Sequence, residues 1–584
     1  MSSVHPALVL LAVVALVVLT RERVQRVVLV AGSMVVFALA AQAEIGSAWT
    51  YSLGAADLGL RLDLQPFRVD TLSYLFGLIF SLITVIGVVY ALDMGRWTEH
   101  AATLTYAAGS LGVVYAGDWL TAFVFWEVMS IASLFVIWHG ATRRSEAAGF
   151  RYLFVHLFGG ALFLTGLWLH IGGGGSLTIG SLVSEGATST WAYWLILVGV
   201  AVNAAIPPLH AWLTDAYPEA SVSGTVFLSA FTTKTAVYVL LRAFPGSSVL
   251  VWAGVVMALY GVVYAVLEND IRRLLGYHIV SQVGYMVAGI GMGTALALDG
   301  TAAHAFCHIL YKALLLMGAG AVIASTGRRN LTDLGGIWKR MPVVTVLYMV
   351  GAFSISGVPL FNGFISKSMI VSAASEAEFT SVELLLTLAS IGTFLHTGLK
   401  LPYFMLFGPD RGVETHPLPQ NKIIAMTMAA ICCVGLGLFP ALLYGRLVFQ
   451  AIDYHPYTTD HVVASLQLLV GTGIGFWLLA GKLGGQATIS LDTDWLYRKM
   501  TPPVFAFAVL GVNGAGRWLE HRGARFVNAA LRVSANPYRL LGLNRDLSAG
   551  VRGEPFDANY YRFPIGVSVF WALTGLILLA LVLW

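Results

Sequence analysis

The stretch Trp119–Trp138, WLTAFVFWEVMSIASLFVIW, decides the fold of this chain. Nearly every residue in it is apolar, and it is long enough to cross a bilayer as one helix, which takes about 20 residues. Glu127 is the exception inside the run. An ionisable group at membrane depth is costly and is normally kept only for a function. The stretch therefore predicts a membrane-spanning helix that carries a carboxyl group for a task.

The whole composition extends this interpretation. Of 584 residues, 58% are hydrophobic and 11% are charged, which is typical of a protein that crosses the membrane many times. The first apolar run, residues 9–19, is followed by no small-residue cleavage pattern, so we expect a retained helix and not a signal peptide. A net charge of only +4 argues against a nucleic-acid partner.

The three cysteines give no sign of a redox or metal centre. Cys307, Cys432 and Cys433 lie in apolar stretches and lack the spacing of a zinc, haem or iron–sulfur site. We therefore expect no metal and no cofactor in this chain.

Spans of about 20 apolar residues divide the chain into roughly sixteen candidate helices. We expect an all-α integral membrane protein with two inverted five-helix repeats and two discontinuous helices. The arginines at 143–144 and 272–273 fall on one side when the helices alternate; positive residues collect on the cytoplasmic side, which puts the N-terminus outside. The expected parts are N-terminal helices 1–100, first repeat 101–243, second repeat 249–408, C-terminal helices 422–481, a cytoplasmic amphipathic segment 482–562 and a final span 563–584.

Two candidate spans are interrupted. NAAIPPL (203–209) contains Pro207 and Pro208, and GVPLFNG (357–363) contains Pro359. Proline removes a backbone donor, which a span tolerates only where protein or a wet cavity covers the gap. The breaks lie five helices apart and so have opposite orientations, a pattern that indicates a transport site near the midplane. The alternative is a pair of kinks used only for packing.

Later spans carry further ionisable groups: Lys234, Lys312, Lys367 and Lys400. His304, His308 and Lys312 follow at four-residue steps and therefore share one helix face. A row of titratable groups inside a membrane suits a hydrated proton relay, because histidine changes charge nearest neutral pH. Lys367 and Lys400 could instead extend from a helix end to the interface.

Six stretches in order, between residues 65 and 410, carry a resemblance to a known family: VDTLSYLF (69–76), FWEVMSIASLF (125–135), PPLHAWLTDAYPEASVSGTVFLSAFTTKTAVYVLLR (207–242), IRRLLGYHIVSQVGYM (271–286), HAFCHILYKALLLMGAG (304–320) and SISGVPLFNGFISKSMI (354–370). The chain resembles the antiporter-like subunits shared by respiratory complex I and the multisubunit Mrp-type cation/proton antiporters. KLPYFMLFG (400–408) and LDTDWLYRK (491–499) look more like the D-type subunit of the Mrp-type antiporters.

The resemblance implies roles for the charges of the first half. Glu127 matches the glutamate that pairs with a buried lysine and switches its proton affinity; a static ion pair is the alternative. The family's main lysine, just before the first break, is replaced here by Asn203, which cannot take up a proton near neutral pH. Lys234 matches the second lysine and is the substitute partner for Glu127. Alternatively, this half holds a cation or only water, with Asn203 as a ligand beside carbonyls freed at Ile206 and Pro207.

The resemblance also assigns the second half. His304, His308 and Lys312 match the central axis of the proton path, and Lys367 matches its outlet. Lys400 corresponds in the inverted repeat to Lys234. Tyr311, His278 and Ser281 are candidate polar linkers between these charges.

Near the C-terminus, RWLEHRGARFVNAALR (517–532) has apolar residues at helical intervals with arginines between them, as in a helix that lies on a membrane surface. Some family members carry a lateral helix at this position; a simple cytoplasmic linker is the alternative.

The functional hypothesis is a proton-translocating subunit of a multisubunit Na⁺/proton antiporter in the bacterial plasma membrane, a transporter component and not itself an enzyme. Its partners would be other subunits, membrane lipid, protons and monovalent cations. The alternative is a proton-pumping, non-redox subunit of a complex I-type NADH:quinone oxidoreductase, or of a related membrane-bound hydrogenase or formate-oxidising complex. A degenerate scaffold is the third hypothesis, to which Asn203 lends some weight.

Overall fold

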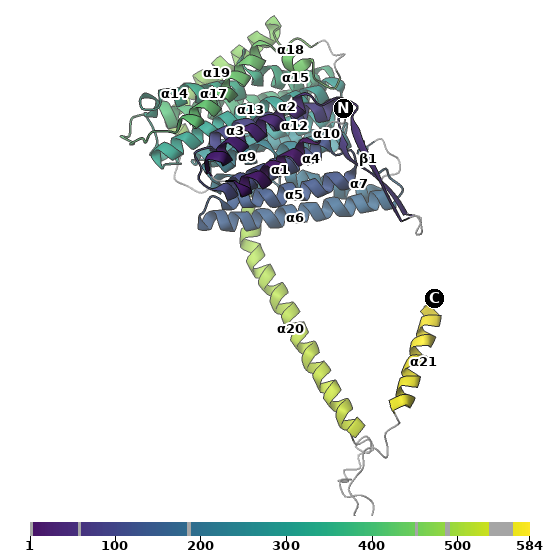
Figure 1. Cartoon of the computed structure of the whole chain (residues 1–584). Coiled ribbons are helices and arrows are strands. Elements are labelled where there is room, and N and C mark those ends of the chain that lie inside the picture. The colour runs from purple at the N-terminus through teal and green to yellow at the C-terminus, as the bar shows by residue number, and fades with distance from the viewer. Residues whose placement is uncertain are drawn as a thin grey trace, which may run out of the picture. The chain divides into compact units, whose positions relative to one another are not determined.

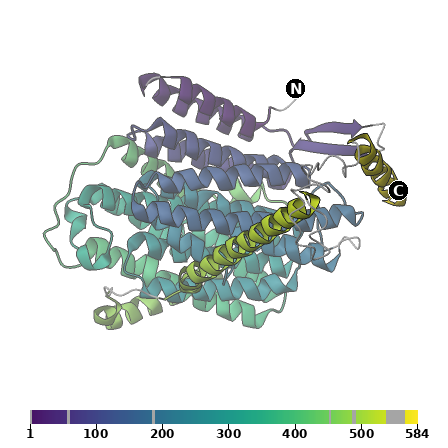
Figure 2. The same cartoon turned by 90° about the horizontal axis from the view of Figure 1, so that it is seen from below.

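A computed structural model of the chain describes residues 4–20, 22–55, 60–183, 189–449, 454–484, 491–535 and 565–583. The chain divides into two units, residues 1–494 and 495–584, which are described separately. Within the first unit, helices lie alongside one another and a hairpin lies close to the start of the first helix (Figures 1 and 2).

The helices of the first unit follow in chain order. They are α1 (Pro6–Leu19), α2 (Glu22–Ala41), α3 (Thr71–Ala91), α4 (Trp97–Tyr115), α5 (Trp119–Trp138), α6 (Arg143–Gly172), α7 (Thr190–Ala204), α8 (Ala211–Ala216), α9 (Val222–Ala230), α10 (Thr232–Ala243), α11 (Ser248–Leu267), α12 (Ile271–Met292), α13 (Ala295–Thr326), α14 (Pro342–Ser356), α15 (Asn362–Glu376), α16 (Thr380–Thr393), α17 (Gln420–Leu438), α18 (Ala441–Tyr444) and α19 (Thr459–Leu483).

The multi-pass membrane fold is confirmed in its broad form. Ten helices in the described part of the chain are long and apolar enough to cross a membrane, and four shorter apolar helices accompany them. The shorter ones include α7 and α14, the first segments of the two interrupted spans. The total of about sixteen spans, the inverted repeats and the outside N-terminus stay predictions.

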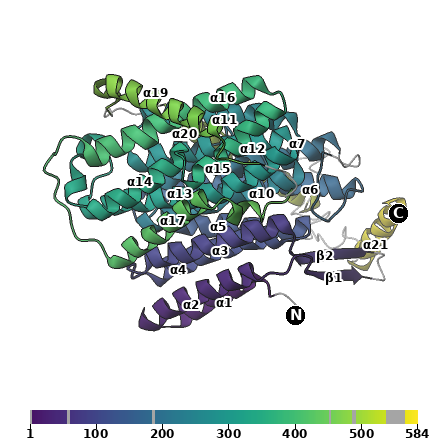
Figure 3. The same cartoon turned by 90° about the horizontal axis from the view of Figure 1, so that it is seen from above.

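The centre of the first unit is α13. Of its most apolar window, 94% is buried inside the protein, against 22% for the window in α2. Figure 3 shows α13 amid the other helices and α1 and α2 at one edge. An apolar helix that is buried on nearly all sides belongs to the core, so most of α13 packs against other helices.

The expectation of an all-α chain is wrong at one place. Strands β1 (Ala48–Ala55) and β2 (Leu60–Arg68) form an antiparallel hairpin between α2 and α3. The sequence Leu60–Gln65, LRLDLQ, alternates apolar and polar residues, which is the period of a strand. The segment is too polar to enter the bilayer, so it lies outside the candidate spans.

The hairpin fixes the start of α5, the helix that carries Glu127. Asp118 caps this helix by accepting from Thr121 N at 2.8 Å. The same carboxylate accepts from Gln65 N of β2, also at 2.8 Å. An aspartate at a helix N-terminus satisfies donors that lack a partner within the helix. The contact to β2 and the helix cap therefore fix the position of the start of α5.

Both expected interruptions are confirmed. The span interrupted at 203–209 breaks between α7 and α8, and Ala205 there has a left-handed backbone with φ of 59°. The span interrupted at 357–363 breaks between α14 and α15, where Gly357 has φ of 73°. Glycine adopts this conformation without steric cost. A Cβ atom at Gly363 would lie 1.7 Å from Ser354 O, so only glycine fits the start of α15.

Two further irregularities were not expected. The apolar stretch 221–243, one of the candidate spans, is divided at Phe231 into α9 and α10. The apolar stretch 384–407, another candidate span, continues from α16 into two π-helical segments, Phe394–Lys400 and Tyr403–Phe407. Such π segments occur frequently at functional sites. Lys234 and Lys400, which the sequence pairs across the repeats, thus both lie at irregular helix positions.

The second unit holds two described helices, α20 (Asp494–Ala535), whose first residue closes the first unit, and α21 (Ile565–Leu583). The expected amphipathic stretch 517–532 is confirmed as helix within α20, whereas its place on a membrane surface stays a prediction. Residues 485–490 and 536–564 of the predicted cytoplasmic segment, and its boundary with the final span, lie outside the described residues.

The segment that leads into α20 is anchored in the first unit by Asp492. Its buried carboxylate accepts from Tyr260 and Tyr277 at 2.5 and 2.6 Å, and contacts His210 Nε2 at 3.2 Å. His210 directly precedes α8, at the first break. Burial alone would raise the pKa of Asp492, but the hydrogen bonds from His210 and the two tyrosines hold it below its ordinary value. The carboxylate thus ties the segment around residue 492 to the broken helix within the first unit.

Replacing Asp492 by asparagine is expected to loosen this anchor. The amide accepts fewer hydrogen bonds than the carboxylate, and the loss of charged hydrogen bonds in a buried cluster costs about 3 kcal/mol. We expect a lower thermal midpoint of the purified protein in detergent and faster tryptic cleavage at Arg498 and Lys499. Because the folded pKa lies below the unfolded value of about 4, this stabilisation is present above that pH and is lost as the pH falls through the folded pKa.

Asp410→Asn is the matched control. Asp410 pairs with Arg340 through two hydrogen bonds of 2.8 and 2.9 Å at the surface. Exposed ion pairs contribute little, so this variant is expected to keep the wild-type midpoint. Equal midpoints for Asp492→Asn and Asp410→Asn would contradict the anchoring role of Asp492.

Candidate functional site

Lys234 is the third residue of α10, just after the boundary with α9. Its side chain is fully buried. The ammonium donates to Ser229 O at 2.6 Å and to Thr233 Oγ1 at 3.2 Å. Ser229 is in the last turn of α9, where backbone carbonyls lack partners within the helix. The irregularity at Phe231 therefore supplies an acceptor that holds a positive charge inside an apolar bundle.

Glu127 lies on α5 against a glycine of α6. A Cβ atom at Gly160 would be 2.2 Å from Glu127 Oε1, so the carboxylate occupies the space that a larger residue would fill. Oε1 has no hydrogen-bond partner among the described residues. Within the same residues no ion pair joins Glu127 to Lys234. The structure thus does not bring the expected pair into direct contact.

The row His304, His308 and Lys312 is confirmed as one buried face of α13, with each side chain at 0% exposure. His304 Nδ1 contacts Ser366 Oγ of α15 at 3.0 Å. Both ring nitrogens of His308 and the Lys312 ammonium have no hydrogen-bond partner within the described part of the chain. Buried polar groups are normally paired, so these orphaned atoms indicate mobile partners such as water or protons.

Polar linkers surround this row. The Tyr311 hydroxyl donates to Gln282 Oε1 at 3.3 Å and contacts His304 Nε2 at 3.5 Å. His308 and Lys312 both interact electrostatically with Lys234, so the row extends toward the first half of the chain. Ser281 Oγ has no described partner. Tyr311 is thus brought into contact with the row, whereas Ser281 is not.

Lys367 follows the second break and repeats the arrangement of Lys234. Its ammonium donates to Ile355 O at 2.9 Å, a carbonyl in the last turn of α14. It also lies 5.5 Å from the centre of the Tyr285 ring. A helix C-terminus carries a partial negative charge that favours a cation. Pro359 lies in the turn between α14 and α15 and so helps to expose this carbonyl.

Lys400 ends the first π-helical segment and is also buried. Its ammonium donates to Val266 O at 2.5 Å and to Glu268 O at 3.1 Å. Both carbonyls lie at the C-terminus of α11. The ammonium groups of Lys367 and Lys400 are thus both largely buried and bonded to carbonyls at helix ends.

Comparison with known proteins identifies the family. Residues 116–395 match the family described as NADH:quinone oxidoreductase/Mrp antiporter, TM. The chain is 30% identical over 414 residues to the D-type subunit of the Na(+)/H(+) antiporter of Alkalihalophilus pseudofirmus, with 65% of this chain and 83% of that protein covered. The chain belongs to this family. It is also 30% identical over 385 residues to the N-type subunit of the NADH-quinone oxidoreductase of Desulforudis audaxviator, with 61% and 77% covered.

A solved structure of the membrane-bound sulfane sulfur reductase, an archaeal respiratory membrane complex, contains a chain of the same fold. The TM-score is 0.69 at 24% identity, and 99% of each chain is covered. This chain and a chain of that complex thus share one fold.

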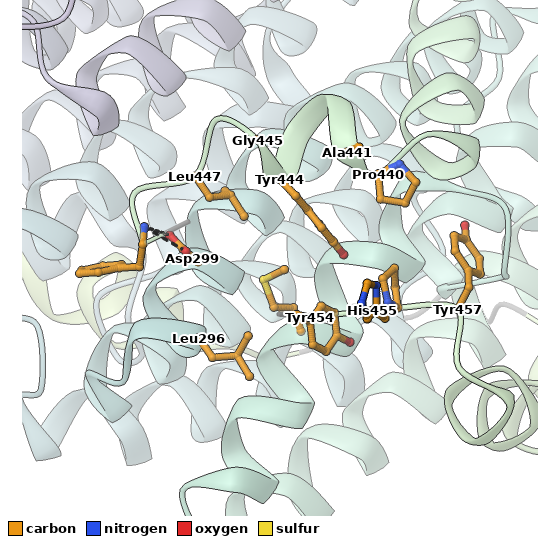
Figure 4. Close-up of a pocket in the computed structure, with 13 residues that line it drawn as sticks. Leu296, Asp299, Pro440, Ala441, Tyr444, Gly445, Leu447, Tyr454, His455 and Tyr457 are labelled. Atoms are coloured by element: carbon orange, nitrogen blue, oxygen red, sulfur yellow. Dashed lines mark hydrogen bonds between the residues drawn. The ribbon is translucent and has the colours of Figure 1, made fainter. Parts of the chain in front are cut away.

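One cavity reaches the charges of this antiporter-family chain from outside. It has a volume of about 870 Å³ and includes Lys367 in its wall. Glu376, Glu383 and His461 line it too. A second cavity of about 680 Å³ is separated from it by Tyr454 and His455, which line both. In Figure 4, Asp299 lies at one end of this second cavity, where its carboxylate accepts from Phe449 N at 3.1 Å.

Sequence reasoning missed His396. This buried side chain lies in the π-helical segment, with its Nδ1 2.6 Å from Nε2 of His278. His278 also contacts the Thr397 hydroxyl. The signal was present, because His396 and Lys400 have the four-residue spacing of His308 and Lys312. The histidine pair lies between Lys400, which interacts with His396, and Lys312, which interacts with both rings.

Replacing Lys312 by methionine is expected to preserve or raise stability, because a buried ammonium without a described partner costs desolvation without compensation. A gain of about 1–3 kcal/mol is expected, read as a higher thermal midpoint of the purified protein in detergent.

The contrasting variant is Lys234→Met. Loss of the ammonium leaves Ser229 O and Thr233 Oγ1 without their donor, so the midpoint is expected to fall. Equal losses in both variants would contradict the difference in pairing between the two lysines.

Proposed function

We propose that this chain is a proton-translocating subunit of a multisubunit monovalent cation (Na⁺)/proton antiporter. One observation carries the proposal: buried lysines and histidines of α10, α12, α13, α15 and the π-helical segment lie within one apolar bundle, with contacts from His304 to Ser366 and Tyr311 and from His278 to His396. Buried ionisable groups at membrane depth are expensive and characteristic of proton and ion pathways. A relative named as a D-type subunit of a Na(+)/H(+) antiporter supports the cation.

The connected charges suggest how protons would move. Lys234 and Lys312 interact as like charges in a medium of low dielectric constant, so a proton on one disfavours a proton on the other. Loading one lysine therefore promotes release from the next. His304 and His308 link Lys312 toward Lys367, where the cavity gives access to water. This order makes Lys367 the outlet and leaves the π-helical branch through His396 as a second exit toward Lys400.

A second function has its own support. The N-type subunit of an NADH-quinone oxidoreductase is as similar in sequence as the antiporter subunit. In a complex of that class, electron transfer in other chains would drive the same proton path. We propose that the chain lies in the bacterial plasma membrane with its N-terminus outside. Partner subunits are expected because both relatives are named as subunits.

Proton flux in inverted vesicles that contain the whole native complex tests the proposal. Flux that starts on addition of Na⁺ or K⁺ supports the antiporter, whereas flux that requires an electron donor supports the redox-driven alternative. Lys312→Met is expected to lower either flux roughly 100-fold, the usual worth of a positioned proton-transfer group. The exposed Lys339→Met is the control and is expected to retain the wild-type rate. Wild-type flux in the assembled Lys312→Met complex would refute the proposed path.

A second variant tests Glu127 through its neighbour. In Gly160→Ala the new methyl group would displace the carboxylate, and a displacement of about 1 Å at a reacting group can cost a 100-fold loss of rate. We expect the proton flux to fall at least about tenfold. Gly172→Ala, on the same helix, has open space around its Cβ position and is expected to leave the flux unchanged. Unchanged flux in Gly160→Ala would favour a scaffold role for this half.

A further inference from the structure

Six side chains on α5, α6 and α7 carry buried polar atoms without a hydrogen-bond partner among the described residues, and three of the six bear a carboxyl, an imidazole or a carboxamide group. These three are Glu127 through Oε1, His156 through both ring nitrogens and Asn203 through both amide atoms, none with a hydrogen-bond partner among the described residues. His156 is 1% exposed and Asn203 is 0% exposed. Buried polar groups without partners are rare in native proteins, and each one needs an explanation. Of the three, His156 and Asn203 are fully buried, whereas Glu127 is half-buried and only its Oε1 is enclosed without a partner.

Helix packing brings these groups together. α6 and α7 run antiparallel, because Gly166 packs on Ile196 while Gly159 packs on Val202. A Cβ atom at Gly199 would lie 2.8 Å from Gly159 O, so glycines allow the two backbones to approach closely. One turn beyond this crossing, His156 is close enough to Asn203 for their side chains to interact.

The same face of α6 also meets α5. Gly160 supports the carboxylate of Glu127, and His156 lies one turn away on that face, since residues four apart on a helix are neighbours. His156 therefore stands on the side of α6 that meets α5, and its side chain is close to the amide of α7. Of the three side chains, Glu127 and His156 can exchange protons, whereas the Asn203 amide cannot ionise near neutral pH.

Aromatic rings hold the imidazole in place. Its centroid lies 3.9 Å from that of Tyr152 and 4.5 Å from that of Trp212. Trp212 is itself fixed, because its Nε1 donates to Val202 O at 2.9 Å. Packing against two aromatic rings restricts the orientation of the imidazole and leaves its nitrogens without a permanent bond.

A group of hydroxyls lies between the helix that carries His156 and the helix that carries Lys234. The Tyr152 hydroxyl contacts Ser133 Oγ at 2.8 Å and Thr232 Oγ1 at 3.4 Å. Thr232 begins α10 and also contacts the Tyr106 hydroxyl at 2.6 Å. Lys234 follows two residues later on the same helix. No described hydrogen bond joins these hydroxyls to the imidazole or to the ammonium, so water would have to complete a proton path at both ends.

We propose that His156 is the proton carrier between Glu127 and Lys234 in the first half of the protein, where Asn203 supplies only a polar contact. The inference rests on the proposed function. The imidazole accepts a proton at one nitrogen from the side of Glu127 and releases one from the other nitrogen toward the group of hydroxyls, so its net charge is restored after each transfer. The titratable groups that face it are Glu127 of α5, Tyr152 of its own helix, Tyr217 beyond Trp212, and Tyr106 and Lys234 across Thr232.

The experiment compares proton flux in inverted vesicles of the whole native complex for wild type, His156→Gln and the double variant His156→Gln with Asn203→Lys. Glutamine keeps hydrogen bonding but cannot carry a proton, so flux is expected to fall roughly 100-fold. A lysine at 203 supplies a titratable group at the facing position, and the double variant is expected to regain flux with its pH optimum shifted to higher pH, because lysine ionises at higher pH than histidine.

His170→Gln is the matched control. His170 is a second buried histidine of α6, and its Nε2 contacts Ser176 O at 3.1 Å. This variant is expected to retain wild-type flux. Thermal midpoints and subunit content of each purified complex show that the variants assemble.

The outcomes separate the inference from the function on which it rests. Wild-type flux in an assembled His156→Gln complex overturns the inference and leaves the proposed function intact. Loss of flux that the assembled double variant does not regain, or regains without a shift in pH optimum, also overturns it and assigns His156 to packing. Absence of cation-driven or redox-driven flux in the wild-type complex overturns the proposed function, and the inference falls with it.

Discussion

The structure depends on carbonyl groups at helix ends that accept hydrogen bonds from buried ammonium groups. Lys234, Lys367 and Lys400 each donate to a carbonyl in the last turn or at the C-terminus of another helical segment. A helix C-terminus offers both unpaired acceptors and the negative end of the helix dipole. A lysine inside an apolar bundle would otherwise lose its hydration without compensation. These contacts allow positive charge to exist at membrane depth.

The interrupted helices follow from this requirement. A continuous helix uses its carbonyls internally, so an acceptor in mid-membrane exists only where a helix stops. The boundary near Phe231 exposes Ser229 O, and the break at Gly357 exposes Ile355 O. The lysine that has no such acceptor, Lys312, lies in the unbroken α13. Its ammonium has no hydrogen-bond partner among the described residues, which suits a group that gains and loses a proton during each cycle.

The two halves use different chemistry around the same plan. The second half has a row of histidines and a lysine on one helix, together with a cavity that reaches Lys367. The first half has a carboxyl group, an imidazole and an amide on three helices, with a group of hydroxyls between the helix of His156 and the helix of Lys234. Glycines at 159, 160 and 199 let those helices approach closely. The difference originates at Asn203, where an ionisable group is absent.

Sequence alone determined the class, the two proline-containing breaks and the row on α13, because apolar length, proline chemistry and helical spacing are local properties. Lys367 and Lys400 are buried in the structure, and their roles in a proton path stay predictions. Sequence alone missed the hairpin, whose alternating pattern is not apolar enough to resemble a span. It did not foresee that Glu127 and Lys234 stay apart, nor that His396 and Asp492 meet partners more than a hundred residues away.

Those features were decided only by tertiary structure. Whether a buried lysine meets a carboxylate or a carbonyl depends on where another helix ends in space, and Glu127 lies against Gly160 because that glycine has no side chain. Spacing along one helix fixes which residues share a face, but it says nothing about the helix that the face meets. The sequence by itself therefore determined which ionisable groups enter the membrane, and the packing of helices decided which of them can exchange protons.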